Sequence, residues 1–312
     1  MNPLKDFLLF LSKRKFLQKL MSTSGPVKFV SKRFVSGENL DEGVRTAQDL
    51  NKYGLLVTLD HLGESVSDEK SALEAAHEYL LIPDRIKGDN HFSLTCSLKL
   101  TQMGLDINYD FCFNNIRNIL KEAARHQKMV TIDMEDSACT DRTLAIYKAM
   151  LKEGYKGTGI VLQAYLKRTE KDIRDMLPLG PRIRLCKGTY KEPAEIVFTK
   201  KKDVDANYIK LTALLLSPES LAFGTYPEIA THDEKIINWT VNYVKANNIP
   251  EDKFEFQMLY GIRRDLQERL VRQGYRMRVY LPYGTHWYPY FMRRLAERPA
   301  NLWFLMKNFF RR

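Results

Sequence analysis

Short apolar stretches alternate with longer amphipathic ones along most of the chain. The short stretches have the length and β-branched content of buried strands, whereas the longer ones repeat apolar residues at helical spacing. The pattern predicts eight strands, at residues 54–60, 91–99, 129–133, 159–165, 182–186, 226–231, 254–259 and 276–281. The sixth strand has the weakest pattern, because residues 221–224 compete with it.

The amphipathic stretches between the strands predict helices at residues 68–81, 110–126, 141–153, 205–216, 233–247 and 263–273. Several of these ranges begin with Asp, a preferred N-cap residue. An alternation of strand and helix repeated eight times is typical of a parallel α/β fold and favours closure into a (β/α)8 barrel. We therefore expect a TIM-like barrel over residues 51–312, preceded by an N-terminal helical arm over residues 1–50.

Composition adds limits to this picture. The chain has 312 residues and a formal net charge of +11, which favours polyanions such as nucleic acid, anionic lipid or a phosphate-bearing cofactor. No apolar run reaches the roughly 20 residues that span a bilayer. Residues 1–21 predict an amphipathic helix that either packs on the domain or contacts a membrane. The four cysteines are not spaced as C-x-x-C, which indicates reduced, mostly buried thiols of a cytoplasmic protein.

Common nucleotide, hydrolase and metalloprotease motifs are absent from the sequence. The one G-x-G, Gly157-Thr-Gly159, lacks the third glycine of a Rossmann fingerprint. Neither a P-loop nor H-E-x-x-H nor G-x-S-x-G occurs. Asp133, Glu135 and Asp136 form only a weak Mg²⁺ candidate, so we predict no metal site.

Polar and ionisable residues stand at the ends of the predicted strands. In a barrel of this class the functional site lies at the carboxyl ends of the strands. The residues there are Asp60, Glu64, Lys99, Asp133, Glu135, Gln163, Tyr165, Arg184, Lys187, Thr231, His232, Gln257, Tyr280 and Tyr283. Any one of them could belong to a structural ion pair, but together they indicate a charged ligand.

A second polar cluster lies near the carboxyl terminus. On a helix, Tyr290, Arg293, Arg294 and Glu297 would share one face. Two adjacent guanidinium groups beside tyrosine make a forked receptor for a carboxylate or phosphate. The alternative is an exposed helix with an Arg–Glu pair, which adds only about 0.3–0.5 kcal/mol. The cluster alone does not decide between the two.

Seven ordered motifs resemble those of the FAD-dependent proline dehydrogenases. They run from Thr58 to Asn301, and the chain length resembles the short, monofunctional bacterial type. The motifs include Ser97-Leu-Lys99, Thr131-Ile-Asp133-Met-Glu135, Gln163-Ala-Tyr165, Arg184-Leu-Cys-Lys187-Gly188-Thr-Tyr190, Ala230-Thr231-His232-Asp233, Phe254-Glu-Phe-Gln257-Met-Leu259, and Arg278-Val-Tyr280 followed by Tyr290-x-x-Arg293-Arg294-x-x-Glu297.

The resemblance implies a distorted (β/α)8 barrel with FAD at the carboxyl ends of its strands. It implies oxidation of L-proline to Δ1-pyrroline-5-carboxylate by hydride transfer from proline C5 to FAD N5, with the electrons passed on to a quinone. Coupling to a pyrroline-5-carboxylate dehydrogenase is a further implied partnership. The implied location is the cytoplasm, with peripheral contact at the inner face of the cell membrane as an option.

The resemblance also implies roles for individual residues. Asp133 and Arg184 correspond to the catalytic pair. The implied substrate residues are Arg293, Arg294 and Lys99 on the proline carboxylate, Tyr280 and Tyr290 as walls of the ring, Leu259 beneath it, and Glu64 as a gate that pairs with Arg293. The C-terminal helix and tail would thus belong to the catalytic domain.

Implied cofactor residues come from four strand ends. Gln163 and Arg184 would lie near the reactive edge of the isoalloxazine, and Met134 would line it through its backbone. The pyrophosphate and ribityl chain would be held by Lys187, Gly188, Thr189, Thr231 and His232. Two departures stand out: the stretch from Gly284 to Tyr290 is shorter than in larger members, and Thr189 replaces a common alanine.

Two other functions compete with this interpretation. A flavin-free barrel lyase acting on a carboxylated or phosphorylated substrate would use the same strand ends and would be colourless. A basic nucleic-acid-binding protein is disfavoured, because the basic residues near the motifs alternate with apolar ones at strand ends. The apolar, basic tail at residues 301–312 predicts either a helix that caps the barrel or a peripheral membrane contact.

Overall fold

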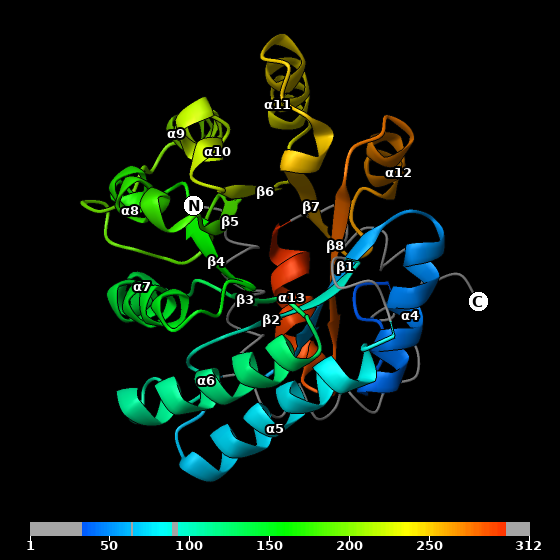
Figure 1. Ribbon diagram of the computed structural model, residues 1–312, viewed down its shortest axis with the longest axis vertical. Helices are drawn as coiled ribbons and strands as arrows, with labels where there is room; N and C mark the ends of the chain where they lie inside the picture. Colours follow the sequence, from blue (N-terminus) through cyan, green and yellow to red (C-terminus); the bar gives the residue numbers. More distant parts are fainter. Residues whose placement is uncertain (1–32, 64, 89–92, 298–312) are drawn as a thin grey trace.

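Eight parallel strands close into a barrel in chain order, with β8 beside β1 (Figure 1). The computed structural model describes residues 33–63, 65–88 and 93–297. The strands are β1 Leu56–His61, β2 Leu94–Leu98, β3 Val130–Ile132, β4 Thr158–Gln163, β5 Arg182–Cys186, β6 Tyr226–Ala230, β7 Glu255–Leu259 and β8 Met277–Tyr283. The (β/α)8 prediction is therefore confirmed, including the sixth strand, since the competing residues lie at the end of a short helix.

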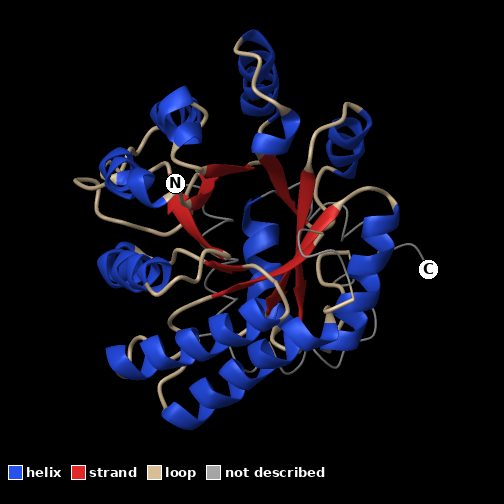
Figure 2. Cartoon of the chain, in the orientation of Figure 1, coloured by secondary structure: helices blue, strands red, loops and turns tan. Residues whose placement is uncertain are grey.

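Helices surround the ring of strands, as Figure 2 shows, except for one that lies within the ring in this view. The described helices are α4 Leu40–Lys52, α5 Glu69–Arg85, α6 Tyr109–Arg125, α7 Ser137–Lys152, α8 Thr169–Met176, α9 Lys201–Leu215, α10 Pro218–Ala222, α11 Glu234–Ala246, α12 Arg264–Arg272 and α13 Trp287–Glu297. Two short 3-10 turns, Leu177–Leu179 and Glu251–Lys253, complete the described elements. The helices predicted between the strands are all present, and α8 and α10 are additions that the apolar pattern was too short to indicate. The helix predicted at residues 1–21 lies outside the described residues.

The observed first residues of the helices differ from the prediction at three of the expected N-caps. Asp68 and Asp233 are N-caps, as predicted. The prediction was wrong for α6, α7 and α9, which begin before the expected Asp. Asn108 and Asp136 cap α6 and α7 by accepting hydrogen bonds from the third backbone N–H beyond them, so the helices start there.

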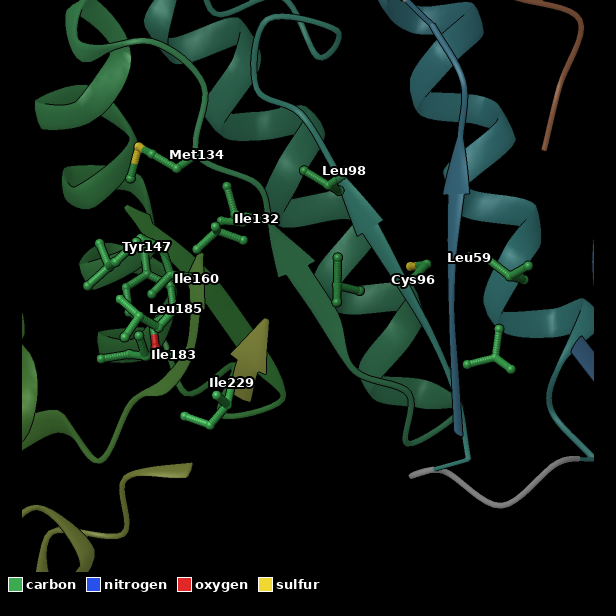
Figure 3. Packing of buried hydrophobic residues seen from close by; sticks show 14 of the residues in the cluster. Leu59, Cys96, Leu98, Ile132, Met134, Tyr147, Ile160, Ile183, Leu185 and Ile229 are labelled. Atoms are coloured by element: carbon green, nitrogen blue, oxygen red, sulfur yellow. The ribbon is translucent and has the colours of Figure 1, made fainter. Parts of the chain in front are cut away.

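Alternation along the strands separates an apolar layer from a polar barrel interior. One set of strand residues is fully or nearly fully buried and apolar. It packs with apolar residues from outside the strands, such as Tyr147 of α7, and Figure 3 labels ten residues of this core. The residues between them, such as Thr58, Thr95 and Arg278, point to the other face, because successive strand side chains alternate. Their contacts join strands inside the barrel: Thr58 Oγ1 lies 2.8 Å from Thr95 Oγ1 on the adjacent strand, and Arg278 Nη1 of β8 lies 3.4 Å from Thr95 Oγ1 of β2.

Charges in the barrel interior are paired. Arg278 donates two hydrogen bonds to Glu255, at 2.5 and 3.0 Å, and both side chains are at most 2% exposed. Gln257 Nε2 donates to Glu255 and to Glu228, which also accepts from Arg182 at 2.5 Å. Such pairing is required because an unpaired buried charge is strongly destabilising. The interior therefore differs from the aliphatic filling that is common in these barrels.

Two helices depart from the regular barrel. Helix α13 follows β8 after the short segment 284–286, so it begins at the carboxyl-terminal mouth, and it lies within the ring of strands in the view of Figure 1. Helix α4 packs on β1 and β8 instead, where Gly43 allows close approach: an added Cβ would lie 3.2 Å from the ring of Tyr283. The expected domain boundary at residue 50 falls inside α4, whose residues Leu40, Val44 and Ala47 join the core.

Candidate active site

Asp133, directly after β3, is the centre of a charged cluster inside the carboxyl end of the barrel. Its carboxylate accepts hydrogen bonds from Ser97 Oγ at 2.6 Å, Tyr280 Oη at 2.6 Å and Arg184 Nη1 at 2.8 Å. These partners come from β2, β8 and β5, so the cluster spans the barrel. Three donors on one carboxylate fix its orientation and leave little capacity to accept a further proton.

Lys99 adds a second cation to the cluster. Its Nζ lies 2.9 Å from Asp60 Oδ1 and 3.6 Å from Asp133 Oδ2. Asp60 is the penultimate residue of β1 and its side chain is 2% exposed, whereas the Lys99 side chain is 24% exposed. Lys99 is therefore held from below by a buried carboxylate while part of it still faces the barrel mouth.

The charged groups of this cluster shift one another's pKa values. Burial opposes ionisation of Asp133, but the positive charges of Lys99 and Arg184, with the hydrogen bonds from Ser97 and Tyr280, lower its pKa overall. Burial likewise opposes the charge on Lys99, yet Asp60 and Asp133 raise its pKa above the usual value. Burial, and then the nearby charge of Asp133, raise the pKa of Tyr280. At neutral pH the cluster thus holds an anionic Asp133, a cationic Lys99 and a neutral Tyr280.

Two donor atoms of Arg184 make no hydrogen bond to the described residues. Its Nη1 binds Asp133 and Ser97, and its guanidinium carbon lies 5.2 Å from the centre of the Tyr280 ring. Its Nε and Nη2 are buried without a hydrogen-bond partner among the described residues, as is Gln163 Oε1. Gln163 is oriented by its amide nitrogen, which donates to the backbone oxygen of Glu135 at 3.0 Å and of Met134 at 3.4 Å. Buried polar atoms without partners are rare in native proteins, so these atoms are candidates to bind a polar ligand.

A second charged cluster lies at the ends of β5 and β6. Lys187 Nζ contacts Asp205 at 2.5 Å and Asp233 at 2.7 Å, and Lys201 binds the same two carboxylates. Burial opposes ionisation of Asp233, but the hydrogen bond and charge of Lys187, followed by Lys201, lower its pKa to about 2. The N–H of Asp233 in turn donates to Thr231 Oγ1 at 3.1 Å. Lys187 and Thr231 are therefore joined through Asp233.

Gly188 forms a concave turn after Lys187. Its φ is +96°, and an added Cβ would lie 2.1 Å from the Tyr165 ring. Only glycine fits this position without strain. Thr189 beside it is exposed, so its side chain and the neighbouring backbone face solvent.

The remaining predicted residues surround the mouth. His232 Nε2 accepts the backbone N–H of Leu259 at 2.9 Å, which joins the ends of β6 and β7. Tyr290 in α13 is buried, as is Met134. Arg293 and Arg294 belong to α13, the helix that begins at the carboxyl-terminal mouth of the barrel. Glu64, the predicted gate, lies outside the described residues.

These groups fit a flavin nucleotide and a small carboxylate. The Arg184 and Gln163 atoms that have no hydrogen-bond partner among the described residues suit the polar edge of a flavin ring, which presents both acceptors and donors. The Gly188 turn with Lys187 suits a phosphate chain that needs close backbone approach and a positive charge. No group of three or more metal-ligating side chains occurs in the parts of the chain that the structure describes.

The sequence patterns assign no role to three of the side chains in these clusters. Asp60 was noted only as a strand end, and Ser97 only as part of a motif. Glu228, whose Oε2 lies 3.7 Å from Arg184 Nε, carried no signal of its own. Its place in the alternating pattern, two residues before the end of β6, marks it as facing the interior.

The comparison with known proteins decides the family. A model described as proline dehydrogenase matches residues 43–307. Proline dehydrogenase 2 of Bacillus subtilis (strain 168) is 46% identical over 304 residues, which cover 97% of this chain and 98% of that protein. Proline dehydrogenase of Deinococcus radiodurans is 38% identical over 283 residues, 89% of each chain. This chain belongs to the proline dehydrogenase family.

Larger relatives contain the same barrel as one part. Proline utilization A from Bdellovibrio bacteriovorus, solved after inactivation by N-propargylglycine, is 27% identical and superimposes with a TM-score of 0.80 over 87% of this chain and 33% of its own. The bifunctional protein PutA of Escherichia coli (strain K12) is 26% identical over 89% of this chain and 24% of its own length. The chain therefore matches the short proline dehydrogenases over nearly their full length, and it matches only the part of the larger proteins that contains the barrel.

The predicted enzyme class is confirmed. The chain is an oxidoreductase of proline catabolism that carries out the first step, oxidation of proline. The lyase alternative finds no support in the comparisons. The family is a flavoenzyme family. Among the described residues, no helix is both long enough and apolar enough to cross a bilayer.

Proposed function

We propose that this proline dehydrogenase binds FAD across the carboxyl ends of its strands, oxidises L-proline to Δ1-pyrroline-5-carboxylate there, and passes the electrons to a quinone. The observation that supports this most is the Asp133 cluster. It presents cations and unpaired buried donors at the place where a flavin and an anionic substrate would meet.

FAD, when bound, would supply the redox chemistry by accepting a hydride from proline C5 at its N5. Gln163 and Arg184 would hold the edge of the flavin ring, with the Met134 backbone along it. The turn of Lys187, Gly188 and Thr189 would hold the phosphates, together with Thr231 and His232 from β6. Lys187 would have to exchange one carboxylate partner for a phosphate, which conserves its charge pairing.

Arg293 and Arg294 would bind the proline carboxylate, and Lys99 would be the third cation. Tyr280 and Tyr290 would wall the pyrrolidine ring with Leu259 beneath it, and Glu64 would pair with Arg293 as a gate. The nitrogen lone pair must assist departure of the hydride, so the substrate amine has to lose its proton. A surplus of cations around the substrate favours the neutral amine and the ionised carboxylate.

Asp133 would orient the neighbouring cations rather than abstract a proton from the substrate. Its oxygens already accept from Ser97, Tyr280 and Arg184, and its lowered pKa makes it a weak base. Its contribution would be to hold Lys99 and Arg184 at fixed positions. Preorganised cations of this kind stabilise negative charge that develops on a reduced cofactor.

The carboxylate assignment is tested by Arg293→Ala and Arg294→Ala. Each change should raise the KM for proline well over tenfold, because a buried charged hydrogen bond is worth about 1.5–3 kcal/mol. Steady-state kinetics measure this, with Arg272→Ala as a control, since that arginine is exposed on α12. A KM close to that of the parent in both active-site variants would refute the assignment.

Peripheral membrane contact and coupling to a pyrroline-5-carboxylate dehydrogenase complete the proposal for a cytoplasmic enzyme. The basic, aromatic residues 301–312 lie outside the described residues and would supply the membrane contact. Flotation with anionic liposomes should carry the full-length protein and leave a protein truncated after residue 300 in the dense fraction. If neither protein floats, the tail does not bind lipid.

A further inference from the structure

The segment between β5 and α9 carries the proposed phosphate-binding turn and is held at both of its ends. At its start, the N–H groups of Ala164 and Tyr165 donate to Cys186 and Lys187 at 2.8 and 2.9 Å. Near its other end, Phe198 N–H donates to Tyr165 at 2.8 Å, and Lys167 N–H donates to Ile196 at 2.9 Å. Both ends of this segment, residues 187–200, are therefore fixed to the residues that follow β4.

In the middle of segment 187–200, the side chain of Glu192 joins the segment to α7. Its Oε1 accepts the backbone N–H of Ser137 at 2.7 Å, and its Oε2 accepts the Ser137 hydroxyl. Ser137 is the first residue of α7, so the carboxylate also faces the positive end of the helix. Asp136 caps the same helix by binding a different donor, the N–H of Cys139, so Glu192 is not needed as the N-cap.

This contact joins two parts of the proposed cofactor site. Ser137 follows Asp133, Met134 and Glu135 at the end of β3, whereas Glu192 follows Lys187, Gly188 and Thr189 at the end of β5. The strand between them, β4, carries Gln163 and pairs with both. A carboxylate with two hydrogen bonds thus connects the segment proposed to line the flavin ring with the segment proposed to hold the phosphates.

We infer that Glu192 is a positioning residue for FAD: by binding Ser137 it holds the Lys187–Thr189 turn at the distance from β3 that the bound dinucleotide requires. The inference rests on the proposed function, because it assumes that this turn holds FAD. Glu192 itself need not touch the cofactor. The contact also keeps its negative charge on the α7 terminus and away from the phosphates.

Release of FAD from the holoprotein tests the role of Glu192. Diluting the purified full-length protein and following flavin fluorescence gives the dissociation constant and the release rate. Glu192→Ala should weaken FAD binding about tenfold or more, whereas Glu195→Ala, which changes an exposed acid of the same segment, should leave it unchanged. Glu192→Ala should also speed tryptic cleavage within segment 187–200 while the melting temperature of the barrel stays near that of the parent.

A double variant separates positioning from other effects. Ser137→Ala removes one half of the contact, so it should weaken FAD binding less than Glu192→Ala does. Because both changes break one interaction, the double variant should bind FAD no more weakly than Glu192→Ala alone. Strictly additive losses, or a Glu192→Ala variant that binds FAD within twofold of the parent, would overturn the inference alone. A parent protein that takes up no FAD would overturn the proposed function as well.

Discussion

At the scale of single residues, the central feature is a carboxylate whose hydrogen-bonding capacity is filled by groups from three other strands. Asp133 binds Ser97, Arg184 and Tyr280 and lies 3.6 Å from Lys99. Burial alone would protonate such a group, and the two adjacent cations keep it ionised. The site therefore depends on mutual pairing of charges, and removal of one partner should alter the others.

Tyr280→Phe removes one donor from Asp133 and keeps the aromatic wall. The loss should raise the pKa of Asp133, so the acid-side fall of kcat/KM should move to higher pH. At neutral pH, kcat/KM should fall about tenfold, as expected for a hydrogen bond to a charged group worth about 1.5–3 kcal/mol. Kinetics across the acid range measure both effects.

The matched control for Tyr280→Phe is Tyr53→Phe, since that tyrosine is 75% exposed. Its pH profile should coincide with that of the parent. An unchanged acid limb in Tyr280→Phe would mean that the hydrogen bond does not influence the ionisation of Asp133.

Residues of the site were predictable in part. Resemblance supplied Asp133, Arg184, Lys99 and Tyr280, and the structure brings these four into one bonded cluster. Asp60 and Glu228 could not be assigned partners, because the contacts that define them join strands 39 or more residues apart. A sequence pattern shows which face of a strand a side chain occupies, but not which of its neighbours it reaches.

At the scale of elements, the strands followed directly from the apolar pattern, whereas two helices did not take regular places. The helix after β8, α13, begins at the mouth of the barrel, and α4 packs on β1 and β8. Amphipathic spacing predicts that a helix has a buried face but not which surface covers it. The short α8 and α10 were missed for a related reason, since one or two turns give too few residues to define a period.

Gly188→Ala tests the turn at the end of β5. The substitution forces alanine into φ +96° and places its Cβ 2.1 Å from Tyr165. Gly274→Ala is the matched control, because its φ is also positive, +87°, and nothing lies within 4 Å of an added Cβ. The control should lose about 1–2 kcal/mol of unfolding free energy from the backbone alone.

Gly188→Ala should lose at least about 1 kcal/mol more than Gly274→Ala, because the ring of Tyr165 must move. Urea unfolding of the two variants measures the difference. Equal losses of unfolding free energy would show that the turn tolerates a side chain. The close packing of Gly188 on Tyr165 would then contribute nothing measurable to stability.

At the scale of the whole molecule, the barrel is held by an apolar layer on one face of the strands and by paired charges on the other. The Arg278–Glu255 pair belongs to the second layer and is at most 2% exposed. Burial opposes ionisation of Glu255, but Arg278 lowers its pKa overall. This interior supports the active site from below, since Glu228 contacts both Arg182 and Arg184.

Arg278→Met should destabilise the protein by about 3–5 kcal/mol, because it leaves the buried charge of Glu255 unpaired. Arg272→Met is the control: its ion pair with Glu268 is exposed and should contribute about 0–1 kcal/mol. Urea unfolding at neutral pH gives both values. A loss below about 1 kcal/mol in Arg278→Met would mean that the interior accommodates an unpaired carboxylate, contrary to the charge pairing described above.

The most direct test of the central claim is the visible spectrum of the purified protein, recorded without oxygen before and after addition of L-proline. The account predicts the bands of an oxidised flavin, and it predicts that proline bleaches them. A flavin that stays oxidised with proline would contradict the substrate-site assignment. A colourless protein that takes up no added FAD would contradict the proposed cofactor site itself.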